Sequence, residues 1–410
     1  MTKADKEGQR KAPILRFKGF TDDWEQRKLN EATTRILRKN KNLISKRPLT
    51  ISAQYGLIDQ QAFFNKQVAS SNLENYLLLE KGEFAYNKSY SDGFPYGTIK
   101  KLNLYDNGAV STLYIAFKAN ADINSDFLEN LFSSNKWNNE VYKIAAEGAR
   151  NHGLLNISPD DFFNIKITIS KDSQEQAFIS KFLRVFDNLL ALYERKLKLL
   201  SQVKKYFLDN LFAEKESPNL RFKGYEDTWL KSKFSKFLSI PEKEKVTIDS
   251  PSRILTVKLN LGGVQKGANR TTLKLNSTTY YLRKAGQLIY GKQNLFNGSL
   301  AIIPPQFEGY VTSGDVPSLN IDNINKQFLY YYIARKSFYE KTEAYSSGTG
   351  SKRIHEKTFL SFNIVYPENL KEQEKISRLI SSINSNIKLY CSKKNKLTAI
   401  KKKLLNTMFI

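Results

Sequence analysis

The chain has 410 residues, enough for two or three domains that each hold a hydrophobic core. Its 65 Lys and Arg residues outnumber 40 Asp and Glu residues, and the resulting net charge of +25 indicates an anionic partner. The aromatic content of 12% favours a folded nucleic-acid-binding protein over a basic disordered tail. The single cysteine, Cys391, excludes an internal disulfide, and two histidines, His152 and His355, are too few for a structural zinc site.

No apolar run approaches about 18 residues, and the first residues, Met1 to Lys11, are charged. We therefore expect neither a membrane span nor a signal peptide, and we expect a cytoplasmic protein.

The sequence contains one long duplication. Leu15-Arg16-Phe17-Lys18-Gly19-Phe20, which we call the Leu-Arg-Phe motif, and the following Trp24 return as Leu220-Arg221-Phe222-Lys223-Gly224-Tyr225 and Trp229, at an offset of 205. Residues 82–88 return at 286–292, an offset of 204, and Phe162 returns as Phe359, an offset of 197. An offset that only shrinks along the chain indicates one unit that was duplicated head to tail and then trimmed in its loops.

Each copy is predicted to consist of a body followed by a long helix. Apolar runs predict strands at 84–88, 110–117 and 162–169 in the first body, and at 253–259, 288–292 and 363–366 in the second. Each body also carries a predicted helix late in its length, at 126–144 and at 325–341. This mixture predicts two α+β bodies, and Ser217-Pro218 marks the joint between the copies.

Residues 175–213 and their copy 372–410 are predicted to form two helices, each about 57 Å long. Apolar residues alternate at spacings of four and three, which is the pattern of a coiled-coil seam. The seam positions are Ile179, Leu183, Phe186, Leu190, Tyr193, Leu197, Leu200, Phe207 and Leu211, and in the copy Ile376, Ile380, Ile383, Ile387, Tyr390, Leu397, Leu404 and Met408. The seams are interrupted at Lys204, Lys394 and Lys401.

The pattern favours pairing of the two helices over the alternative, two amphipathic helices that pack separately on two domains. If the pair is antiparallel, the chain nearly closes into a ring, with Ile410 near Leu15. Ser173 with Gln176, and Asn369 with Glu372, predict capping boxes at the two helix starts.

The sequence shows no convincing catalytic site. Pro159-Asp160 followed by Glu194-Arg195-Lys196 matches a nuclease-like pattern, but the second part lies on a long helix where the pattern requires a strand. Gly348-Thr349-Gly350 lacks the spacing of a phosphate loop, and the chain has neither a methyltransferase glycine motif nor an Asn-Pro-Pro-aromatic tetrapeptide. We therefore expect no catalytic residue, no metal and no cofactor in this chain.

Basic, polar and glycine-punctuated loops are the candidates for DNA contact. Lys and Arg can neutralise phosphates, Arg can bridge guanine, and Asn and Gln can pair with adenine. The candidates are Asn87, Lys88, Ser89, Tyr90, Lys100, Lys101, Arg150, Asn151 and His152 in the first body, and Arg270, Lys292, Gln293, Asn294, Lys352 and Arg353 in the second. The alternative for each is an ordinary residue of a solvated turn. Tyr55, Tyr280 and Tyr281 are expected to pack inside the bodies.

The chain resembles, along its whole length, the specificity subunit of Type I restriction-modification systems. The marks are the doubled Leu-Arg-Phe motif with its Trp, the Gly-rich loops 148–157 and 348–354, and the Glu-Gln pairs that open the long helices, Glu175-Gln176 and Glu372-Gln373. The first Gly-rich loop departs from the second, because it runs three residues longer to its Ile.

The resemblance implies an α+β fold with two pseudo-two-fold-related target recognition domains separated by a long antiparallel two-helix coiled coil. The predicted boundaries are 12–172 for the first target recognition domain, 173–216 for the first spacer helix, 217–369 for the second target recognition domain and 370–410 for the second spacer helix.

The resemblance also implies a non-catalytic subunit that recognises a bipartite site in double-stranded DNA. It would direct two methyltransferase subunits and, for restriction, the ATP-driven restriction subunits, and these partners would hold S-adenosylmethionine, ATP and Mg²⁺. The predicted partner-binding residues are Phe17, Trp24, Phe222 and Trp229. Two rival hypotheses are a self-contained restriction or methylation enzyme and a coiled-coil nucleoprotein that binds DNA without sequence preference.

Overall fold

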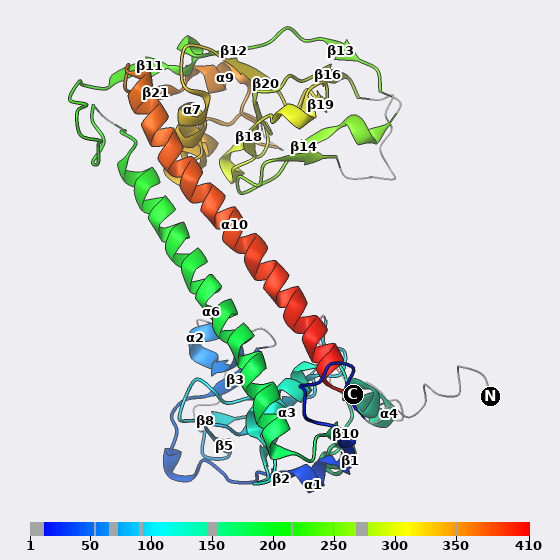
Figure 1. The fold of residues 1–410 in the computed structure, drawn as a ribbon. Coiled ribbons are helices and arrows are strands. Elements are labelled where there is room, and N and C mark those ends of the chain that lie inside the picture. Colours follow the sequence, from blue (N-terminus) through cyan, green and yellow to red (C-terminus); the bar gives the residue numbers. More distant parts are fainter. Residues whose placement is uncertain are drawn as a thin grey trace. The chain divides into compact units, whose positions relative to one another are not determined.

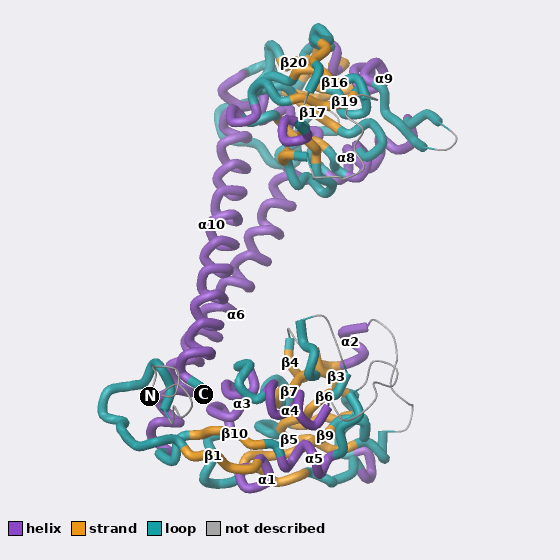
Figure 2. The backbone as a smooth tube through the Cα atoms, turned by 90° about the vertical axis from the view of Figure 1, so that its right-hand side faces the viewer, coloured by secondary structure: helices purple, strands orange, loops and turns teal. Residues whose placement is uncertain are grey.

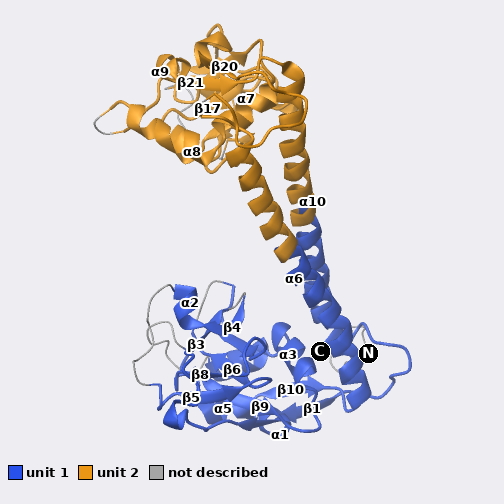
Figure 3. Cartoon of the chain, turned by 90° about the vertical axis from the view of Figure 1, so that its left-hand side faces the viewer, with its two compact units in different colours: residues 1–194, 392–410 blue, residues 195–391 orange. Residues whose placement is uncertain are grey.

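The computed structural model describes residues 12–52, 55–64, 73–89, 93–145, 155–214, 216–248, 250–267, 278–348 and 351–410. The chain forms two compact units, residues 1–194 with 392–410 and residues 195–391 (Figure 3). Each unit contains one body and one half of each long helix. The units therefore divide both spacer helices, and the four ranges drawn from the sequence stay a prediction. No helix within the described ranges is both long and apolar enough to cross a membrane.

The elements are named in Figure 1. The strands of the first body are β1 (Glu25–Lys28), β2 (Thr33–Arg35), β3 (Leu49–Ser52), β4 (Gly56–Asp59), β5 (Leu77–Glu80), β6 (Phe84–Asn87), β7 (Thr98–Lys101), β8 (Asn107–Val110), β9 (Ile115–Ala119) and β10 (Lys166–Ile169). Its helices are α1 (Leu29–Ala32), α2 (Gln60–Phe64), α3 (Ser125–Ser133), α4 (Asn138–Ala145) and α5 (Pro159–Asn164).

The second body has the strands β11 (Leu230–Lys233), β12 (Leu238–Ser239), β13 (Lys245–Val246), β14 (Leu255–Val257), β15 (Val264–Lys266), β16 (Tyr280–Leu282), β17 (Leu288–Tyr290), β18 (Leu300–Ile302), β19 (Val311–Ser313), β20 (Ser318–Ile321) and β21 (Asn363–Tyr366). Its helices are α7 (Lys326–Ile333), α8 (Lys336–Tyr339) and α9 (Glu356–Ser361). The long helices are α6 (Ser173–Asn210) and α10 (Leu370–Met408).

The first body is built around the four-stranded antiparallel sheet β2-β9-β6-β7 (Figure 2). Strand β6 is central, because Phe84 pairs with Phe117 of β9 on one side and with Lys101 of β7 on the other. The first three residues of β6 are fully buried, which explains its continuous apolar run. Tyr86 stacks on Phe162 of α5 with ring centroids 4.6 Å apart, so this helix covers the sheet.

The second body repeats this arrangement. Its sheet β12-β20-β17-β18 has β17 at the position of β6, and Tyr290 stacks on Phe359 of α9 with centroids 4.8 Å apart. In each body a separate two-stranded sheet, β1-β10 or β11-β21, pairs the strand after the Leu-Arg-Phe motif with the strand before the long helix. The two bodies therefore share one arrangement of sheets and covering helices, which we call the frame, as the duplication predicts.

The structure corrects three predicted strands. Residues 110–117 form parts of two strands, β8 and β9, because the chain turns where the Tyr114 N–H donates to the Ser111 carbonyl. Residues 162–169 begin inside α5, whose N-cap Ser158 accepts a hydrogen bond from the Asp161 N–H. Of the predicted strand 253–259, only Leu255–Val257 is extended in a sheet.

Both predicted body helices are divided. Residues 126–144 form α3 and α4, because the Ser134 N–H closes α3 on the carbonyls of Asn130 and Leu131. Residues 325–341 likewise form α7, α8 and the start of a 3₁₀ helix, Glu340–Tyr345. The strands predicted at 84–88, 288–292 and 363–366 are confirmed as β6, β17 and β21.

The long helices run antiparallel. Within the first unit, Glu194 of α6 accepts from the Lys394 ammonium of α10 at 2.7 Å, and Asp187 pairs with Lys401. From Asp187 to Glu194 the residue number rises along α6, whereas from Lys401 to Lys394 the number of the paired residue falls along α10. The two helices therefore run in opposite directions. The alternative of two separately packed helices is therefore wrong.

Three lysines at seam positions have different surroundings. Lys394 and Lys401 each pair with a carboxylate of α6, so their charges are balanced. Lys204 is the copy of Lys401, and the copy of Asp187 is Asn384, a neutral residue whose side chain donates to the Tyr331 hydroxyl at 3.3 Å. Burial lowers the pKa of Lys204, and the nearby charge of Lys388 lowers it further. The second unit therefore carries a seam lysine in a less favourable environment than its copy.

The helix starts differ from the predicted capping boxes. Asp172, not Ser173, caps α6, since its carboxylate accepts from the N–H groups of Gln174 at 2.7 Å and Glu175 at 3.2 Å. Asn369 does cap α10 by accepting from the Lys371 N–H at 2.9 Å. Glu175 and Glu372 each stand three residues after the capping residue. Their carboxylates accept hydrogen bonds from Arg16 and Arg221 of the Leu-Arg-Phe motifs.

Candidate nucleic-acid interface

Each Leu-Arg-Phe motif is fastened to the start of a long helix by a buried glutamate, an arrangement that we call the glutamate clasp. Arg16 donates to Glu175 from Nε at 2.6 Å and from Nη2 at 2.9 Å, and Glu175 is fully buried. Arg221 donates to Glu372 in the same way, at 2.8 and 2.9 Å. These hydrogen bonds raise the pKa of both arginines. The clasp explains why Glu opens both long helices.

The motifs also bind the ends of the long helices. The Leu15 N–H donates to the Thr407 carbonyl of α10 at 2.9 Å, and the Leu220 N–H donates to the Asn210 carbonyl of α6 at the same distance. Each motif therefore joins the end of one long helix to the start of the other. The expectation that the last residues lie near Leu15 agrees with the first of these contacts.

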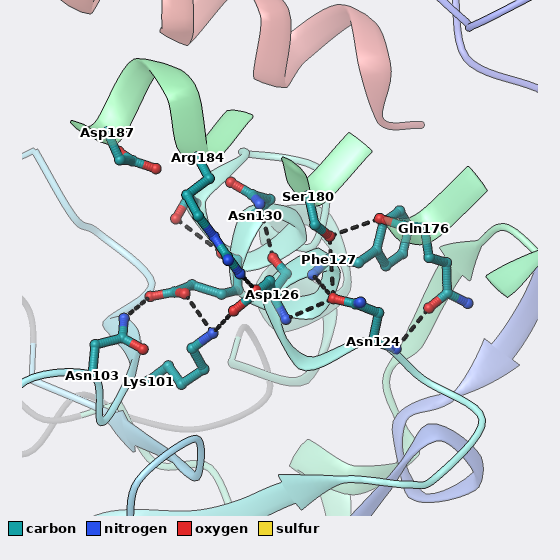
Figure 4. Close-up of polar contacts among 12 residues, drawn as sticks. Lys101, Asn103, Asn124, Asp126, Phe127, Asn130, Gln176, Ser180, Arg184 and Asp187 are labelled. Atoms are coloured by element: carbon teal, nitrogen blue, oxygen red, sulfur yellow. Dashed lines mark hydrogen bonds and ion pairs between the residues drawn. The ribbon is translucent and has the colours of Figure 1, made fainter. Parts of the chain in front are cut away.

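The glutamine of each Glu-Gln pair holds the helix to its body. The Gln176 carboxamide oxygen accepts from the Asn124 N–H at 2.8 Å, and the Ser180 hydroxyl donates to the Asn124 side chain at 3.2 Å (Figure 4). In the second unit, Gln373 accepts from Asn325 at 2.8 Å, and Ser377 donates to Asn325 at 3.1 Å. Because each Asn is the N-cap of α3 or α7, each body is locked to one end of the helix pair.

Lys101 is predicted to contact DNA, and the structure places it among carboxylates of the first body. Its side chain is buried and its ammonium pairs with Asp126 and, at 2.9 Å, with Glu129 (Figure 4). Arg184 of α6 also pairs with Asp126. Lys101 therefore neutralises carboxylates inside the first unit and has no charge to spare for a phosphate.

The neighbouring Lys100 is in a partly acidic setting. It lines a groove of about 1040 Å³ in the first unit, together with Glu129, Asp187 and Glu194. Burial lowers the pKa of Lys100, while the charge of Glu129 raises it. Since Glu129, Asp187 and Glu194 are each paired with a lysine, the groove offers little unbalanced charge to a DNA backbone.

The loop after β6 is the part of the first-body prediction that the structure describes. The Asn87 carboxamide accepts from the Ser89 N–H at 3.0 Å, and the Lys88 ammonium donates to the Ile157 carbonyl at 2.9 Å. The Leu155 N–H donates to the Lys88 carbonyl at 3.1 Å, so the chain after the Gly-rich loop is tied to the end of β6. The predicted residues Tyr90, Arg150, Asn151 and His152 lie outside the described residues.

In the second body the corresponding residues come together. The Lys292 ammonium pairs with Glu356 at 3.0 Å, and the Ile354 N–H donates to the Lys292 carbonyl at 2.9 Å. With the Gln293 carboxamide oriented so that its oxygen faces Arg353, this oxygen accepts from Nε at 3.2 Å and from Nη2 at 2.9 Å. The loop at the end of β17 is thus joined to the loop before α9, as in the first body.

The remaining second-body candidates are more dispersed. Asn294 precedes a short 3₁₀ helix and accepts from the Asn297 side chain at 3.1 Å. Lys352 pairs with Glu343 at 2.7 Å on an exposed surface. Arg270 lies outside the described residues.

A polar cavity of about 560 Å³ adjoins the Lys292 and Arg353 loops. It is lined by Lys243, Tyr281, Arg283, Lys292, Asp315, Arg353, His355 and Glu356, among others. Four of these side chains are cationic and two are acidic, so the cavity suits an anionic or hydrogen-bonding ligand.

Arg283 is a cavity residue that the sequence reasoning missed. It donates to Thr312 at 2.6 Å, and burial lowers its pKa to about 10. At the offset of 204 its counterpart is Leu79, and this replacement of an apolar residue by a cation was the available signal. Tyr280 is buried as expected, whereas Tyr55 is exposed.

The predicted partner-binding residues divide into two kinds. Trp24 and Trp229 are 4% and 3% exposed, so their rings belong to the cores and leave almost no surface for a partner. The Trp24 indole donates to Glu175 at 2.9 Å, within the glutamate clasp. Phe17 and Phe222 are half-buried and remain accessible in part.

Residues 231–399 match the family model described as Type I restriction modification DNA specificity domain. A curated relative, the specificity subunit of the Type I restriction enzyme MjaVIII from Methanocaldococcus jannaschii, is 25% identical over 300 residues, which cover 68% of each chain.

Two solved structures share the fold. The S subunit of a Type I restriction-modification system from M. genitalium has a TM-score of 0.61 at 14% identity, covering 97% of this chain and 99% of that one. A chain from a structural study of assembly and conformational transition of the type I R-M system has a TM-score of 0.51 at 15% identity, covering 94% and 97%. The likeness confirms the predicted α+β class. Residues 231–399 are thus similar to the Type I restriction modification DNA specificity domain, and the chain as a whole is similar to Type I specificity subunits in sequence and in fold.

Proposed function

We propose that this chain recognises a bipartite DNA target, with each body reading one half, and that it directs partner enzymes to that site. The observation that carries this proposal is one frame with two different sets of loops. The clasps Arg16–Glu175 and Arg221–Glu372 have nearly the same geometry. The similarity to a DNA specificity domain and to a Type I specificity subunit supports DNA target recognition as the general function.

The loops at equivalent places carry different side chains. Asn87, Lys88 and Ser89 stand at the end of β6, whereas the equivalent positions after β17 hold Gly291, Lys292 and Gln293. Because base edges are distinguished by the identity of the donor and acceptor groups that meet them, two unlike loop sets would read two unlike half-sites. The net charge of +25 supports attraction to the phosphate backbone of both halves.

We further propose that methylation and restriction are performed by partner subunits, which would hold S-adenosylmethionine, ATP and Mg²⁺. The cationic and acidic groups in the second-body cavity, such as Lys292 and Glu356, are paired with each other. An ion pair of this kind holds a loop in place, whereas a general base needs an unpaired acceptor near its substrate.

A partner surface lies along α6 in the first unit. Phe178, Val185, Leu189 and Leu192 are exposed apolar residues, each one position before a seam residue. Phe17 of the Leu-Arg-Phe motif contacts Phe178 with ring centroids 6.1 Å apart, so the motif extends the same surface. We propose that a methyltransferase subunit packs on these residues, which we call the α6 stripe.

The equivalent surface on α10 is less apolar. The copies of the α6 stripe residues are Lys375, Ser382, Asn386 and Leu389. The repeated motifs support two bound methyltransferase copies, but the unlike flanks imply that the two are held with unequal strength.

The test of the proposal uses the purified chain, alone and with its methyltransferase. Competition between a duplex containing the methylated motif and a random duplex at fixed salt should show strong preference for the motif. Equal competition would support the nucleoprotein without sequence preference, since phosphate contacts alone give no such ratio. Methylation or cleavage by the chain alone would support the self-contained enzyme.

A further inference from the structure

We propose that Arg353 reads a guanine in the half-site bound by the second body, with Gln293 and Asp315 as positioning residues. This inference rests on the proposed function and assigns one side chain to one base type. Sequence reasoning placed Arg353 and Gln293 together among direct DNA contacts, whereas the structure gives them different tasks.

The backbone around Arg353 is fixed from two sides. Its N–H donates to the Ser347 carbonyl at 2.9 Å, and its carbonyl accepts from the Ser347 N–H at 3.0 Å. The next residue, Ile354, donates to the Lys292 carbonyl at 2.9 Å and is fully buried. The Cα of Arg353 is therefore held against the end of β17.

The guanidinium is held as well. Gln293 accepts from Nε and Nη2, and Asp315 lies 3.6 Å from Nη2. The side chain is still 40% exposed, and it borders the 560 Å³ cavity. Gln293 takes the Nε–Nη2 edge of the fork, and Asp315 lies beyond hydrogen-bond distance of Nη2, so the Nη1–Nη2 end of the fork remains for the two acceptors of a ligand.

An arginine that is held along its Nε–Nη2 edge and keeps the Nη1–Nη2 end of its fork for a ligand suits base reading better than phosphate binding. Guanine presents two acceptors, O6 and N7, in the major groove, and arginine is their commonest partner. A phosphate contact tolerates a mobile lysine, whereas base reading depends on the fixed planar fork. Ordering Arg353 before binding also lowers the entropic cost of recognition.

Lys352 is the matched control. It precedes Arg353 in the chain and carries the same charge, but it pairs with Glu343 at 2.7 Å and does not line the cavity. A general electrostatic effect of this loop would appear equally in variants of both residues.

The experiment expresses the full chain with its methyltransferase and determines the methylated motif by single-molecule sequencing of host DNA. Arg353→Lys should relax one guanine position in one half-site, with loss of about 5- to 150-fold discrimination, and leave the other half unchanged. Gln293→Ala should relax the same position more weakly, and Lys352→Ala should leave the motif unaltered.

Three results would overturn the inference. In the first, Arg353→Lys retains the wild-type motif, which would identify a phosphate contact. In the second, Arg353→Lys alters a position that is not guanine. In the third, Lys352→Ala changes the motif as much as Arg353→Lys does. Arg353→Ala, checked for complex formation by native mass spectrometry, gives a second reading of the same position. A wild-type complex that shows no bipartite motif would instead contradict the proposed function.

Discussion

Replacing Arg16 with alanine should destabilise the first unit far more than loss of a surface ion pair. Glu175 is fully buried and accepts four hydrogen bonds, two from Arg16, one from Trp24 at 2.9 Å and one from Ser170 at 2.5 Å. Arg16→Ala removes the only cation in this set and leaves a buried carboxylate with two neutral donors. Breaking a buried pair on one side costs about 3–5 kcal/mol.

Calorimetry of the purified chain measures this effect. For a unit of this size, about 3–5 kcal/mol corresponds to a fall of roughly 6–20 °C in the Tm of the first unit. Lys81→Ala is the matched control, because Lys81 and Asp106 are exposed and 3.9 Å apart, and such a pair contributes about 0–1 kcal/mol. Arg221→Ala should lower the Tm of the second unit at least as much, because among the described side chains Glu372 accepts hydrogen bonds from Arg221 alone.

The double variant Arg16→Met with Glu175→Met separates the destabilisation caused by an unpaired buried charge from the stability that the ion pair itself contributes. Replacing both partners of a buried pair with apolar side chains is often nearly neutral, so the double variant should be more stable than Arg16→Ala. An Arg16→Ala protein whose first transition falls no further than that of Lys81→Ala would refute the reasoning.

The helix pair and the partner surface give two further predictions. Asn384→Asp should stabilise the second unit by about 0.3–1 kcal/mol, because it supplies Lys204 with the carboxylate partner that its copy has in the first unit. Burial lowers the pKa of Lys204 below the unfolded value of 10.5, so the wild-type unit should gain stability as pH rises toward that value, and denaturation at several pH values should show a smaller gain in Asn384→Asp. Leu189→Ser should weaken methyltransferase binding by about tenfold, with Leu389→Ser on the other flank as control, and equal effects in calorimetric titrations would count against the α6 stripe.

The sequence predicted the frame well because the frame is periodic and repeated. The seams of α6 and α10 keep one register over many turns, and a pattern of that length has few competing structures. The strand at 363–366 was also predicted correctly, since it is a short apolar run beside the long helix. The doubled Leu-Arg-Phe motif located the start of each copy.

Local signals caused the errors. The turn between Ser111 and Tyr114 contains no Gly or Pro, so β8 and β9 were joined into one strand. Phe162 continues an apolar run and was assigned to a strand, although Ser158 and Pro159 are the start of a helix. In both places a tertiary or capping preference outweighed the apolar pattern.

The candidate site was harder to predict, because charge alone does not show what a side chain pairs with. Lys101 belongs to a basic dipeptide, but its partners, Asp126 and Glu129, come from a helix about 25 residues later in the chain. Arg353 is basic too, and only the fold shows that its side chain lies beside Gln293 and Asp315 and is still 40% exposed.

The separation of frame from reading loops explains how one fold can hold two recognition surfaces. The stacked aromatic pairs Tyr86–Phe162 and Tyr290–Phe359 and the two glutamate clasps lie in the buried parts of the bodies, and they recur in both copies. The loops after β6 and β17 contribute few buried apolar side chains. Since the stability of a domain is a small difference between large terms, replacements in the frame endanger folding, whereas replacements in the loops leave most of that difference intact. Replacing Ser89 with Gln, the residue at the equivalent position 293, can therefore alter what is read without altering how the bodies are held.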